Sequence, residues 1–328
     1  MQTRGTQKRP ATAGARRYWL IWIAVAPLLA WAFVRGFGLD HGFPLVPLMA
    51  FTPYAAIAAL LVAGVATALR NWAAAVVAAL VTVCLAAAVL PRAIGDGTVD
   101  PGGRETLVVL SANIHHGTAD PAAVIELIER YDVDLLCVQE LTPTFARKLR
   151  QTGIGSLLPN EVLETHRSAS GAGLYSRLPM QKLPGSQFFF RQPRAALQLP
   201  DGHRIRVVGV HPFPPGRGND DNWQEALESL PSAGNGAPWI LVGDFNATLD
   251  VSLMRETIAR GYRDAGEVAG EGLTPTFPRE GHLIPPITID HILADERLDV
   301  VDYEVEDLPG SDHRALRVEL AMAYRSVH

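Results

Sequence analysis

The sequence predicts an α/β domain that is preceded by three membrane-spanning helices. The first observation is composition: residues 1–90 contain long apolar runs and one acidic residue, Asp40, whereas 33 of the 34 acidic residues follow. The second is periodicity, because residues 106–328 alternate short apolar runs typical of strands with amphipathic runs typical of helices. Strands outnumber helices in this part, which favours two sheets or one large mixed sheet.

Three apolar segments without a charged residue occupy residues 18–34, about 43–69 and 72–90. Each is close to the roughly 17 to 25 residues that cross a bilayer. Tryptophans stand at the ends of the first and third segments, where interfacial anchors occur. We therefore assign residues 1–90 to a membrane anchor. The alternative is a cleaved signal peptide followed by buried, alanine-rich helices.

Basic residues predict the orientation of these segments. Arg35 alone lies in the loop after the first segment, whereas five basic residues precede that segment: Arg4, Lys8, Arg9, Arg16 and Arg17. By the positive-inside rule the N-terminus stays in the cytoplasm, and three crossings leave the chain after Pro91 outside. A cleaved first segment would leave a two-span hairpin with the same outcome. We expect a multi-pass protein of the plasma membrane whose second part is extracytoplasmic.

The second part follows a linker at residues 91–105, which is rich in Pro, Gly and charge. Residues 106–113 (TLVVLSAN) predict a buried strand, and Asp120 and Pro121 supply an N-cap and a first-turn proline for the next helix. A strand over 134–140 and a helix over 142–150 come next. Further strands are predicted near 171–176, 195–199, 204–211, 238–243, 288–293 and 315–322, with helices near 219–230 and 252–260.

Charge and cysteine content argue against some classes of site. Residues 91–328 carry 22 basic and 33 acidic residues, a net charge of −11, which is a poor match for a nucleic-acid backbone. Cys84 lies in an apolar run and Cys137 in a predicted strand. Both fit small buried hydrophobic positions better than disulfide or metal-ligand positions.

Polar residues end most of the predicted strands. In ILVGDFNATLD, the side-chain period of two puts Asp244 and Asn246 on one face and Phe245 on the other. Taken singly, such residues are most often turn or cap residues. Six elements that all end or begin this way instead predict one shared site: Asn113, Gln139-Glu140, His211, Asp244 with Asn246, Asp290, and Asp312-His313.

The ordered set N113, QE140, GAGLYSR at 171–177, H211, GDFN at 243–246, DHI at 290–292 and SDH at 311–313 resembles the endonuclease/exonuclease/phosphatase superfamily. The resemblance covers about 104–322 and implies a four-layer α/β sandwich, two packed sheets flanked by helices. The N-terminal segments resemble a membrane-tethered subset that includes teicoplanin-resistance-type proteins, which implies a link to antibiotic resistance.

The resemblance also implies residue roles. Glu140 is expected to be the principal metal ligand, with Asn113 and Asp312 beside it. Hard oxygen donors without cysteine favour Mg²⁺, with Mn²⁺ or Ca²⁺ as alternatives. The expected catalytic group comprises a water-orienting or water-activating Asp244, Asn246 to hold water or phosphate, His313 oriented by Asp290 as base or cationic stabiliser, and His211 as a donor to phosphate.

Four other residues near these motifs have no settled role. His115 and His116 are expected in a solvated loop, with a place in the pocket as the alternative. Arg177 and Arg314 fit either a phosphate contact or a structural ion pair.

The substrate expected from these features is a lipid-linked phosphate or pyrophosphate at the outer face of the bilayer, because the domain is acidic and tethered close to that surface. An extracellular nuclease is the first alternative, with nucleic acid the less favoured substrate. A non-catalytic membrane module of the same fold is the second. No obligate protein partner is inferred from the sequence.

Overall fold

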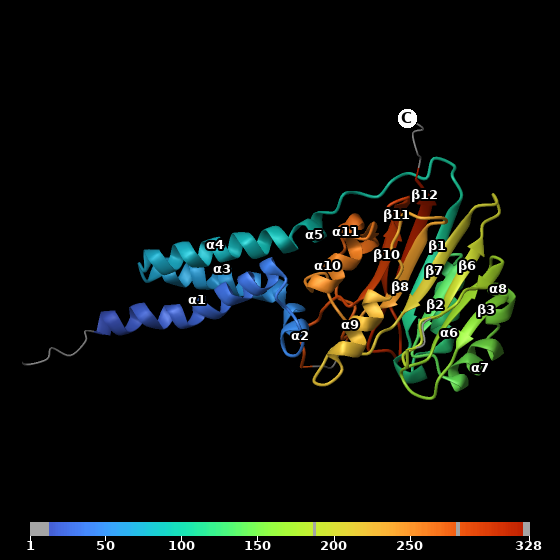
Figure 1. Ribbon diagram of the computed structural model, residues 1–328, viewed down its shortest axis with the longest axis horizontal. Helices are drawn as coiled ribbons and strands as arrows, with labels where there is room; N and C mark the ends of the chain where they lie inside the picture. Colours follow the sequence, from blue (N-terminus) through green and yellow to red (C-terminus); the bar gives the residue numbers. More distant parts are fainter. Residues whose placement is uncertain (1–12, 186–187, 280–282, 324–328) are drawn as a thin grey trace, which may run out of the picture. The chain divides into compact units, whose positions relative to one another are not determined.

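The computed structural model describes residues 13–185, 188–279 and 283–323 (Figure 1). The chain divides into two compact units, one of residues 1–39 and 52–88 and the other of residues 40–51 and 89–328. The predicted orientation depends on basic residues that lie largely outside this description. Arg4, Lys8 and Arg9 are outside the described residues, as are the side chains of Arg16 and Arg17.

From residue 13 on, the first unit consists of three helices, α1 (Ala13–Phe37), α3 (Thr52–Ala68) and α4 (Trp72–Val89). Small residues lie in its interior, where Ala59, Ala66 and Ala74 are fully buried. Large apolar residues face outward, and the most exposed of them on α3 and α4 include Ile57, Leu60, Leu61, Val76, Leu80 and Val83. Small residues at helix contacts and large apolar residues outside are typical of helices in lipid.

Two of these helices are long and apolar enough to cross a membrane, at Trp19–Phe37 and Trp72–Val89. The helix α3 is also apolar but has 17 residues. By length and composition the described part of the chain therefore gives two candidate spans, where the sequence predicted three.

The predicted second segment, about 43–69, is wrong as a single helix. Its first residues form a separate short helix, α2 (Leu45–Met49), which belongs to the second unit, and α3 begins only at Thr52. Prolines at 44, 47 and 53 explain the break, because a proline cannot donate a backbone hydrogen bond inside a helix.

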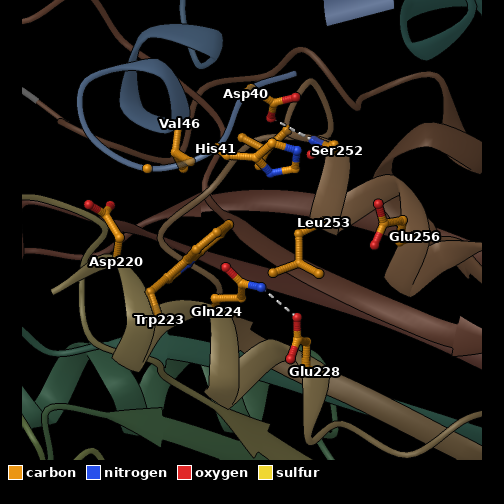
Figure 2. Close-up of a pocket in the computed structure, with 12 residues that line it drawn as sticks. Asp40, His41, Val46, Asp220, Trp223, Gln224, Glu228, Ser252, Leu253 and Glu256 are labelled. Atoms are coloured by element: carbon orange, nitrogen blue, oxygen red, sulfur yellow. Dashed lines mark hydrogen bonds between the residues drawn. The ribbon is translucent and has the colours of Figure 1, made fainter. Parts of the chain in front are cut away.

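The segment 40–51 is bonded to the rest of the second unit. Oδ2 of Asp40 accepts a hydrogen bond of 2.8 Å from the backbone nitrogen of Ser252, the first residue of α10 (Ser252–Ile258). The backbone nitrogen of Phe43 donates to Oδ2 of Asp220 in α9 (Asp220–Glu228), at 2.9 Å. A small polar pocket of about 60 Å³ remains between this segment, α9 and α10 (Figure 2). Residues 40–51 are thus an integral part of the second unit.

The second unit contains two six-stranded mixed sheets. The first has the order β11-β12-β1-β2-β4-β3, with strands β1 (Thr106–Asn113), β2 (Leu135–Gln139), β3 (Asn160–Glu164), β4 (Ala172–Ser176), β11 (Leu298–Asp307) and β12 (Arg314–Met322). The second has the order β5-β6-β7-β8-β10-β9, with strands β5 (Met180–Lys182), β6 (Arg194–Gln198), β7 (Arg204–Val210), β8 (Trp239–Asp244), β9 (Tyr262–Asp264) and β10 (Asp290–Asp295).

The two sheets pack face to face and carry helices outside. Alternate residues of β1, such as Leu107 and Val109, join residues of β8 and β10 in the core between the sheets. Their neighbours Val108 and Leu110 pack instead with α6 (Pro121–Arg130), α7 (Pro143–Gln151) and α8 (Ile154–Leu157) on the outer face. The helices α9, α10 and α11 (Ala265–Ala269) lie beside the second sheet (Figure 1). The predicted arrangement of two packed mixed sheets flanked by helices is confirmed.

The predicted linker, residues 91–105, is held to this domain along its length. It contains a short helix, α5 (Pro91–Ile94), and Arg92 forms two buried hydrogen bonds to Asp250, at 2.8 and 3.0 Å. The backbone nitrogens of residues 96 and 97 both donate to the carbonyl of Val268, and that of Val99 donates to Val300. Its Pro and Gly content therefore reflects an irregular packed segment and not a free tether.

Strand directions bring the predicted site residues to one edge. In each sheet a parallel pair, β1 with β2 and β7 with β8, ends at this edge. The antiparallel strands β12 and β10 begin there, since Leu316 pairs with Ser111 and Asp290 pairs with Asp244. The ends of four strands and the beginnings of two others thus meet around one point.

Candidate active site

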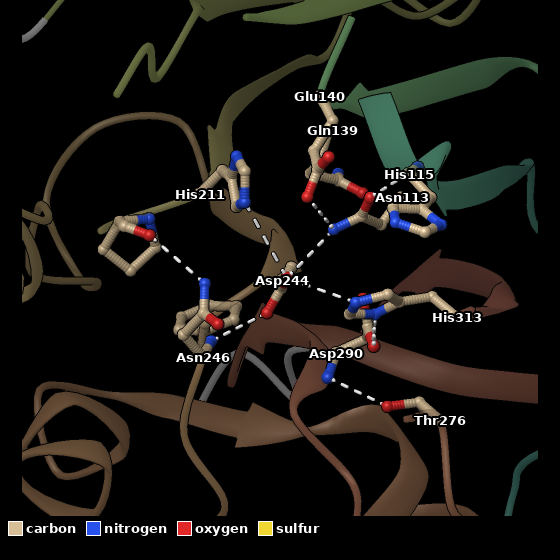
Figure 3. Close-up of polar contacts among 12 residues, drawn as sticks. Asn113, His115, Gln139, Glu140, His211, Asp244, Asn246, Thr276, Asp290 and His313 are labelled. Atoms are coloured by element: carbon tan, nitrogen blue, oxygen red, sulfur yellow. Dashed lines mark hydrogen bonds and ion pairs between the residues drawn. The ribbon is translucent and has the colours of Figure 1, made fainter. Parts of the chain in front are cut away.

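Asp244 lies at the centre of this edge (Figure 3). Its Oδ2 accepts a hydrogen bond of 3.0 Å from Nδ2 of Asn113, and it lies 3.8 Å from Nε2 of both His211 and His313. Its Oδ1 accepts a hydrogen bond of 2.8 Å from the backbone nitrogen of Asn246. The structure therefore brings together side chains from both sheets around one buried carboxylate.

The backbone around Asp244 requires Gly243 and Asn246, the first and last residues of the GDFN motif. Gly243 has φ +146°, and a Cβ there would lie 2.1 Å from the carbonyl oxygen of Val210, so that only glycine fits. Asn246 has φ +53°, a left-handed conformation that Asn tolerates better than most residues. The backbone of this turn is therefore strained at two positions, and Gly and Asn are the residues that tolerate that strain. The turn places the side chains of Asp244 and Asn246 on one side. Phe245 is fully buried on the other side.

Asp290 and His313 form a buried pair next to Asp244. Nδ1 of His313 lies 2.8 Å from Oδ2 of Asp290. Burial alone lowers the pKa of His313, but the pair with Asp290 and the nearby carboxylates of Asp244 and Asp312 outweigh it and raise the pKa to about 10. The imidazole is therefore a cation at neutral pH.

The other two titratable groups are shifted mainly by burial. Burial, and then the negative charge of Asp290, raise the pKa of Asp244 to about 7. Burial lowers the pKa of His211 to about 3, so that this ring is neutral. Three neighbouring groups whose pKa values differ this widely are typical of an acid–base centre.

Glu140 and Asn113 adjoin this group from the first sheet. Nδ2 of Asn113 lies 3.4 Å from Oε1 of Glu140, in addition to its bond with Asp244. Oε2 of Glu140 accepts a hydrogen bond of 2.7 Å from the backbone nitrogen of His116. Nδ1 of His115 lies 3.4 Å from Oδ1 of Asp312. The loop at His115 and His116, expected in solvent, thus lies over two predicted metal ligands, although both rings are about half exposed.

A divalent cation fits this donor set. Three carboxylates, Asp244, Asp290 and Asp312, act on the single imidazolium of His313, and Glu140 adjoins them through Asn113, which leaves an excess of negative charge. Oδ1 of Asp312 is buried and accepts no hydrogen bond from the described residues. Carboxylate oxygens are the ligands that Mg²⁺ prefers. The ligand atoms of Asp244, Asp290 and His313 lie within 4.8 Å of one another, but a protonated imidazole has no lone pair to give a metal, so His313 is not a donor in this state. The sequence assigned the metal to Asn113, Glu140 and Asp312.

Sequence reasoning missed several supporting residues. Oγ1 of Thr276 accepts hydrogen bonds from the backbone nitrogens of Ile289 and Asp290, at 3.1 and 3.2 Å. Oγ of Ser311 donates to the carbonyl of Asn113 and accepts from the backbone nitrogen of His313. These contacts fix the backbone at the candidate site residues Asn113, Asp290 and His313. Only the serine stands inside a motif, so only it could have been found from the sequence.

A second buried ion pair lies behind the GDFN turn. Nδ1 of His291 lies 2.9 Å from Oδ2 of Asp264, and Nε2 lies 3.0 Å from the carbonyl oxygen of Ala247. With an acceptor at each nitrogen, the ring donates from both, which requires the imidazolium. Burial opposes this charge, but the pair with Asp264 outweighs it and the pKa of His291 is raised. Through its bond to the carbonyl oxygen of Ala247, His291 holds the backbone directly after Asn246 in place.

The two arginines left open by the sequence have structural partners. Arg177 pairs with Asp132 at 2.6 Å. Arg314 pairs with Asp307 at 3.0 Å and donates to the carbonyl of Pro275. Both arginines are therefore engaged in structural pairs.

Comparisons with known proteins agree with this fold. The profile of the Endonuclease/Exonuclease/phosphatase family matches residues 110–313. Among solved structures, an endonuclease/exonuclease/phosphatase from Beutenbergia cavernae is 19% identical with a TM-score of 0.51, covering 69% of this chain and 74% of that one. A D. rerio TDP2 humanised by 14 mutations is 15% identical with a TM-score of 0.52, covering 66% of this chain and 99% of that one. No curated protein matches the chain.

The family match spans well over half of the chain and contains every predicted site residue, from Asn113 to His313. Family members are divalent-metal-dependent hydrolases of phosphate ester bonds. The chain belongs to the endonuclease/exonuclease/phosphatase family and is a hydrolase of this type.

Proposed function

We propose that this protein is a membrane-anchored, extracytoplasmic phosphoesterase that uses Mg²⁺ to hydrolyse a lipid-linked phosphate or pyrophosphate. The observation that carries the phosphoesterase part is the buried contact of Asp244 with Asn113, His211 and His313 at the shared edge of the two sheets. The teicoplanin-resistance-type subset of the family has the architecture that this proposal requires, and a role in antibiotic resistance would follow from it.

Each side chain of the site has a task that suits its state. Asp244, with a pKa near 7, orients or deprotonates the attacking water. The imidazolium of His313, held by Asp290, stabilises charge that develops on the phosphoryl oxygens. Neutral His211 keeps one N–H to donate to phosphate.

The metal and an amide complete the assignment. Glu140, Asn113 and Asp312 would hold Mg²⁺, which when bound supplies charge neutralisation at the phosphate. Asn246 is fixed by a hydrogen bond of 3.2 Å from its Nδ2 to the carbonyl of Pro212. That bond leaves its side-chain oxygen to accept from the attacking water.

Anchoring is supported by the surface of the helical unit. On α3, Ile57, Leu60 and Leu61 have exposed fractions of 58%, 59% and 65%, which would be costly in water but not in hydrocarbon. The 17 residues of α3 are at the short end of the spanning range. These features favour α3 as a third span besides the two candidates that qualify by length.

The division of the chain supports the same number of crossings. Residues 40–51 and 89–328 form one folded unit, so both segments belong on one side of a membrane. The chain between them then crosses an even number of times. If α4 spans, α3 spans as well, and α1 makes the third crossing. The orientation itself rests on the basic residues before α1.

The substrate proposal rests on charge and location. The second part of the chain has a net charge of −11, and a nucleic-acid backbone would be repelled by it. A phosphate carried by a membrane lipid reaches the same site without that cost. An extracellular nuclease is the alternative, since a solved structure of similar fold is that of D. rerio TDP2 complexed with a single-strand DNA product.

The test compares phosphate release from farnesyl pyrophosphate with cleavage of single- and double-stranded DNA, using the full chain in detergent with and without Mg²⁺. We expect metal-dependent release of phosphate and little DNA cleavage. Preferential cleavage of DNA would replace the lipid proposal with the nuclease.

For topology, a reporter enzyme that is active only outside the cytoplasm and is fused after residue 328 should be active. Activity from a cytoplasmic reporter at that position would reverse the orientation.

A further inference from the structure

Three consecutive phenylalanines precede β6, and they form the wall of an apolar pocket. The pocket has a volume of about 150 Å³ and is lined by Phe188, Phe189, Phe190, Phe213, Asn222 and Ala226. Among the residues that the structure describes, Asn222 is the single polar residue in this lining, and no charged side chain contributes. Such a lining binds hydrocarbon and offers almost nothing to an ionic group.

The pocket adjoins the active site through the ring of Phe190. The ring of Phe190 packs edge-to-face on the ring of His211, with centroids 5.0 Å apart, and on the ring of Phe213 at 4.7 Å. His211 and Phe213 are two residues apart in the same segment. His211 lies 3.8 Å from Asp244, and Phe213 lines the pocket. A molecule whose phosphate sits at Asp244 therefore has the pocket next to it.

One rim of the pocket is exposed. Phe189 has an exposed fraction of 60%, while its neighbour Phe190 has 8%. Exposed large apolar residues on loops beside a polar site indicate contact with an apolar ligand or lipid.

We propose that this phenylalanine pocket binds the first carbons of a hydrocarbon chain that is esterified to the phosphate under attack. The inference rests on the proposed function and adds the residues that select the lipid. An apolar cavity of about 150 Å³ accepts a benzene-sized group, so the pocket holds about one five-carbon unit. The rest of the hydrocarbon chain leaves the pocket over the exposed ring of Phe189.

A hydrocarbon chain fits this pocket better than a nucleobase. A base that is selected in a pocket needs hydrogen-bonding partners for its polar edge, and in the described lining Asn222 is the one residue that offers them. The acidic domain also disfavours a polynucleotide. The candidate membrane helices, in contrast, keep the enzyme where lipid chains are.

The test uses three phosphate monoesters that differ only in the group attached: decyl phosphate, methyl phosphate and thymidine 5′-phosphate. The variant is Phe189→Ser with Phe213→Ser, in the full chain in detergent with Mg²⁺. Val99→Ser is the matched control, because Val99 is an exposed apolar residue outside this pocket, with an exposed fraction of 39%. We expect wild type to prefer decyl over methyl phosphate at least tenfold in kcat/KM. The double variant should lose this preference through a higher KM for decyl phosphate, and the control should keep it.

Two results would overturn the proposal. If the double variant lowers kcat/KM equally for decyl and methyl phosphate, the phenylalanines merely support His211. If wild type prefers thymidine 5′-phosphate and the double variant loses that preference, the pocket binds a base.

A binding experiment separates this inference from the proposed function. The catalytically impaired Asp244→Asn protein is titrated with decyl and methyl phosphate. Binding of decyl phosphate that is at least tenfold tighter, and that disappears when Phe189→Ser and Phe213→Ser are added, supports the pocket even if no monoester is hydrolysed. Equal binding of the two ligands refutes the pocket, whatever the activity.

Discussion

Replacing Asp244 with Asn should stabilise the metal-free protein while removing activity. The carboxylate is buried, and burial with the nearby charge of Asp290 raises its pKa from the ordinary 3.8 to about 7. At 1.36 kcal/mol per pKa unit, keeping this group ionised costs the folded state about 4 kcal/mol. Asn carries no charge and avoids this cost.

The stabilisation expected for Asp244→Asn is reduced because the variant loses one hydrogen bond. Asp244 accepts one bond from Asn113 and one from the backbone nitrogen of Asn246. The amide of Asn can accept only one of these and turns a donor toward the other, which costs about 1 to 3 kcal/mol. The expected net stabilisation is about 1 to 3 kcal/mol.

The sign of the pH dependence follows from the raised pKa. The free-energy cost of ionising Asp244 in the folded protein is absent below its unfolded-state pKa of about 4. It grows as pH rises and is complete above its folded-state pKa of about 7. Near pH 4 only the cost of the lost hydrogen bond remains, so in thermal unfolding of the full chain in detergent with a chelator Asp244→Asn should unfold at a lower temperature than wild type. At pH 8 the variant should unfold at the higher temperature.

Added Mg²⁺ should leave this order at pH 8 unchanged, because the residues that would hold it, Glu140, Asn113 and Asp312, are all present in the variant. Phosphate release by the variant should fall by orders of magnitude. A variant that is less stable than wild type at pH 8 without metal would refute the reasoning. So would a variant that retains full activity.

Three further predictions concern neighbours of this residue. Phe245→Ala should mainly cost stability, on the order of 3 to 5 kcal/mol, because the ring is fully buried; a midpoint within one degree of wild type would contradict this. Glu140→Gln keeps the shape and removes the charge, so metal-dependent activity should fall by orders of magnitude at unchanged stability, and full activity without added metal would exclude Glu140 as a ligand. The imidazolium of His291, paired with Asp264, contributes stability that is complete below about pH 6.5 and is lost as pH rises through its raised pKa. The midpoint gap between wild type and His291→Gln should therefore narrow from pH 6 to pH 9, and a constant gap would show that the ring is neutral.

The fold was predictable wherever a strand is buried on both faces. The strands β1, β2 and β8 are apolar along nearly their whole length and are buried throughout, which gives a clear signal in the sequence. The edge strands β3 and β11 were missed. In β11, LDVVDYEVED alternates apolar with acidic residues because one sheet edge is open to solvent. Such a pattern looks like a charged loop when only the sequence is read.

The site was predictable to the extent that its residues end strands. Asn113, Asp244 and His313 all follow or precede apolar runs, and the strand order brings them together. The roles of Asp264 and Thr276 were not predictable, because each acts on a backbone or side chain far away in the sequence. Their contacts exist only once the second sheet has formed.

The hydrogen bond from Ser252 to Asp40 affects where the enzyme can be cut to obtain a soluble fragment. The sequence suggests a start at residue 106, but such a fragment lacks Arg92 and leaves Asp250 as a buried charge without its guanidinium. Loss of one partner of a buried ion pair costs about 3 to 5 kcal/mol. A start at residue 89 restores Arg92 but still removes Asp40, which accepts the backbone hydrogen bond at the start of α10. A fragment that behaves like the whole enzyme therefore needs residues 40–51 supplied as well, either as a peptide added in trans or by a short linker that replaces α3 and α4.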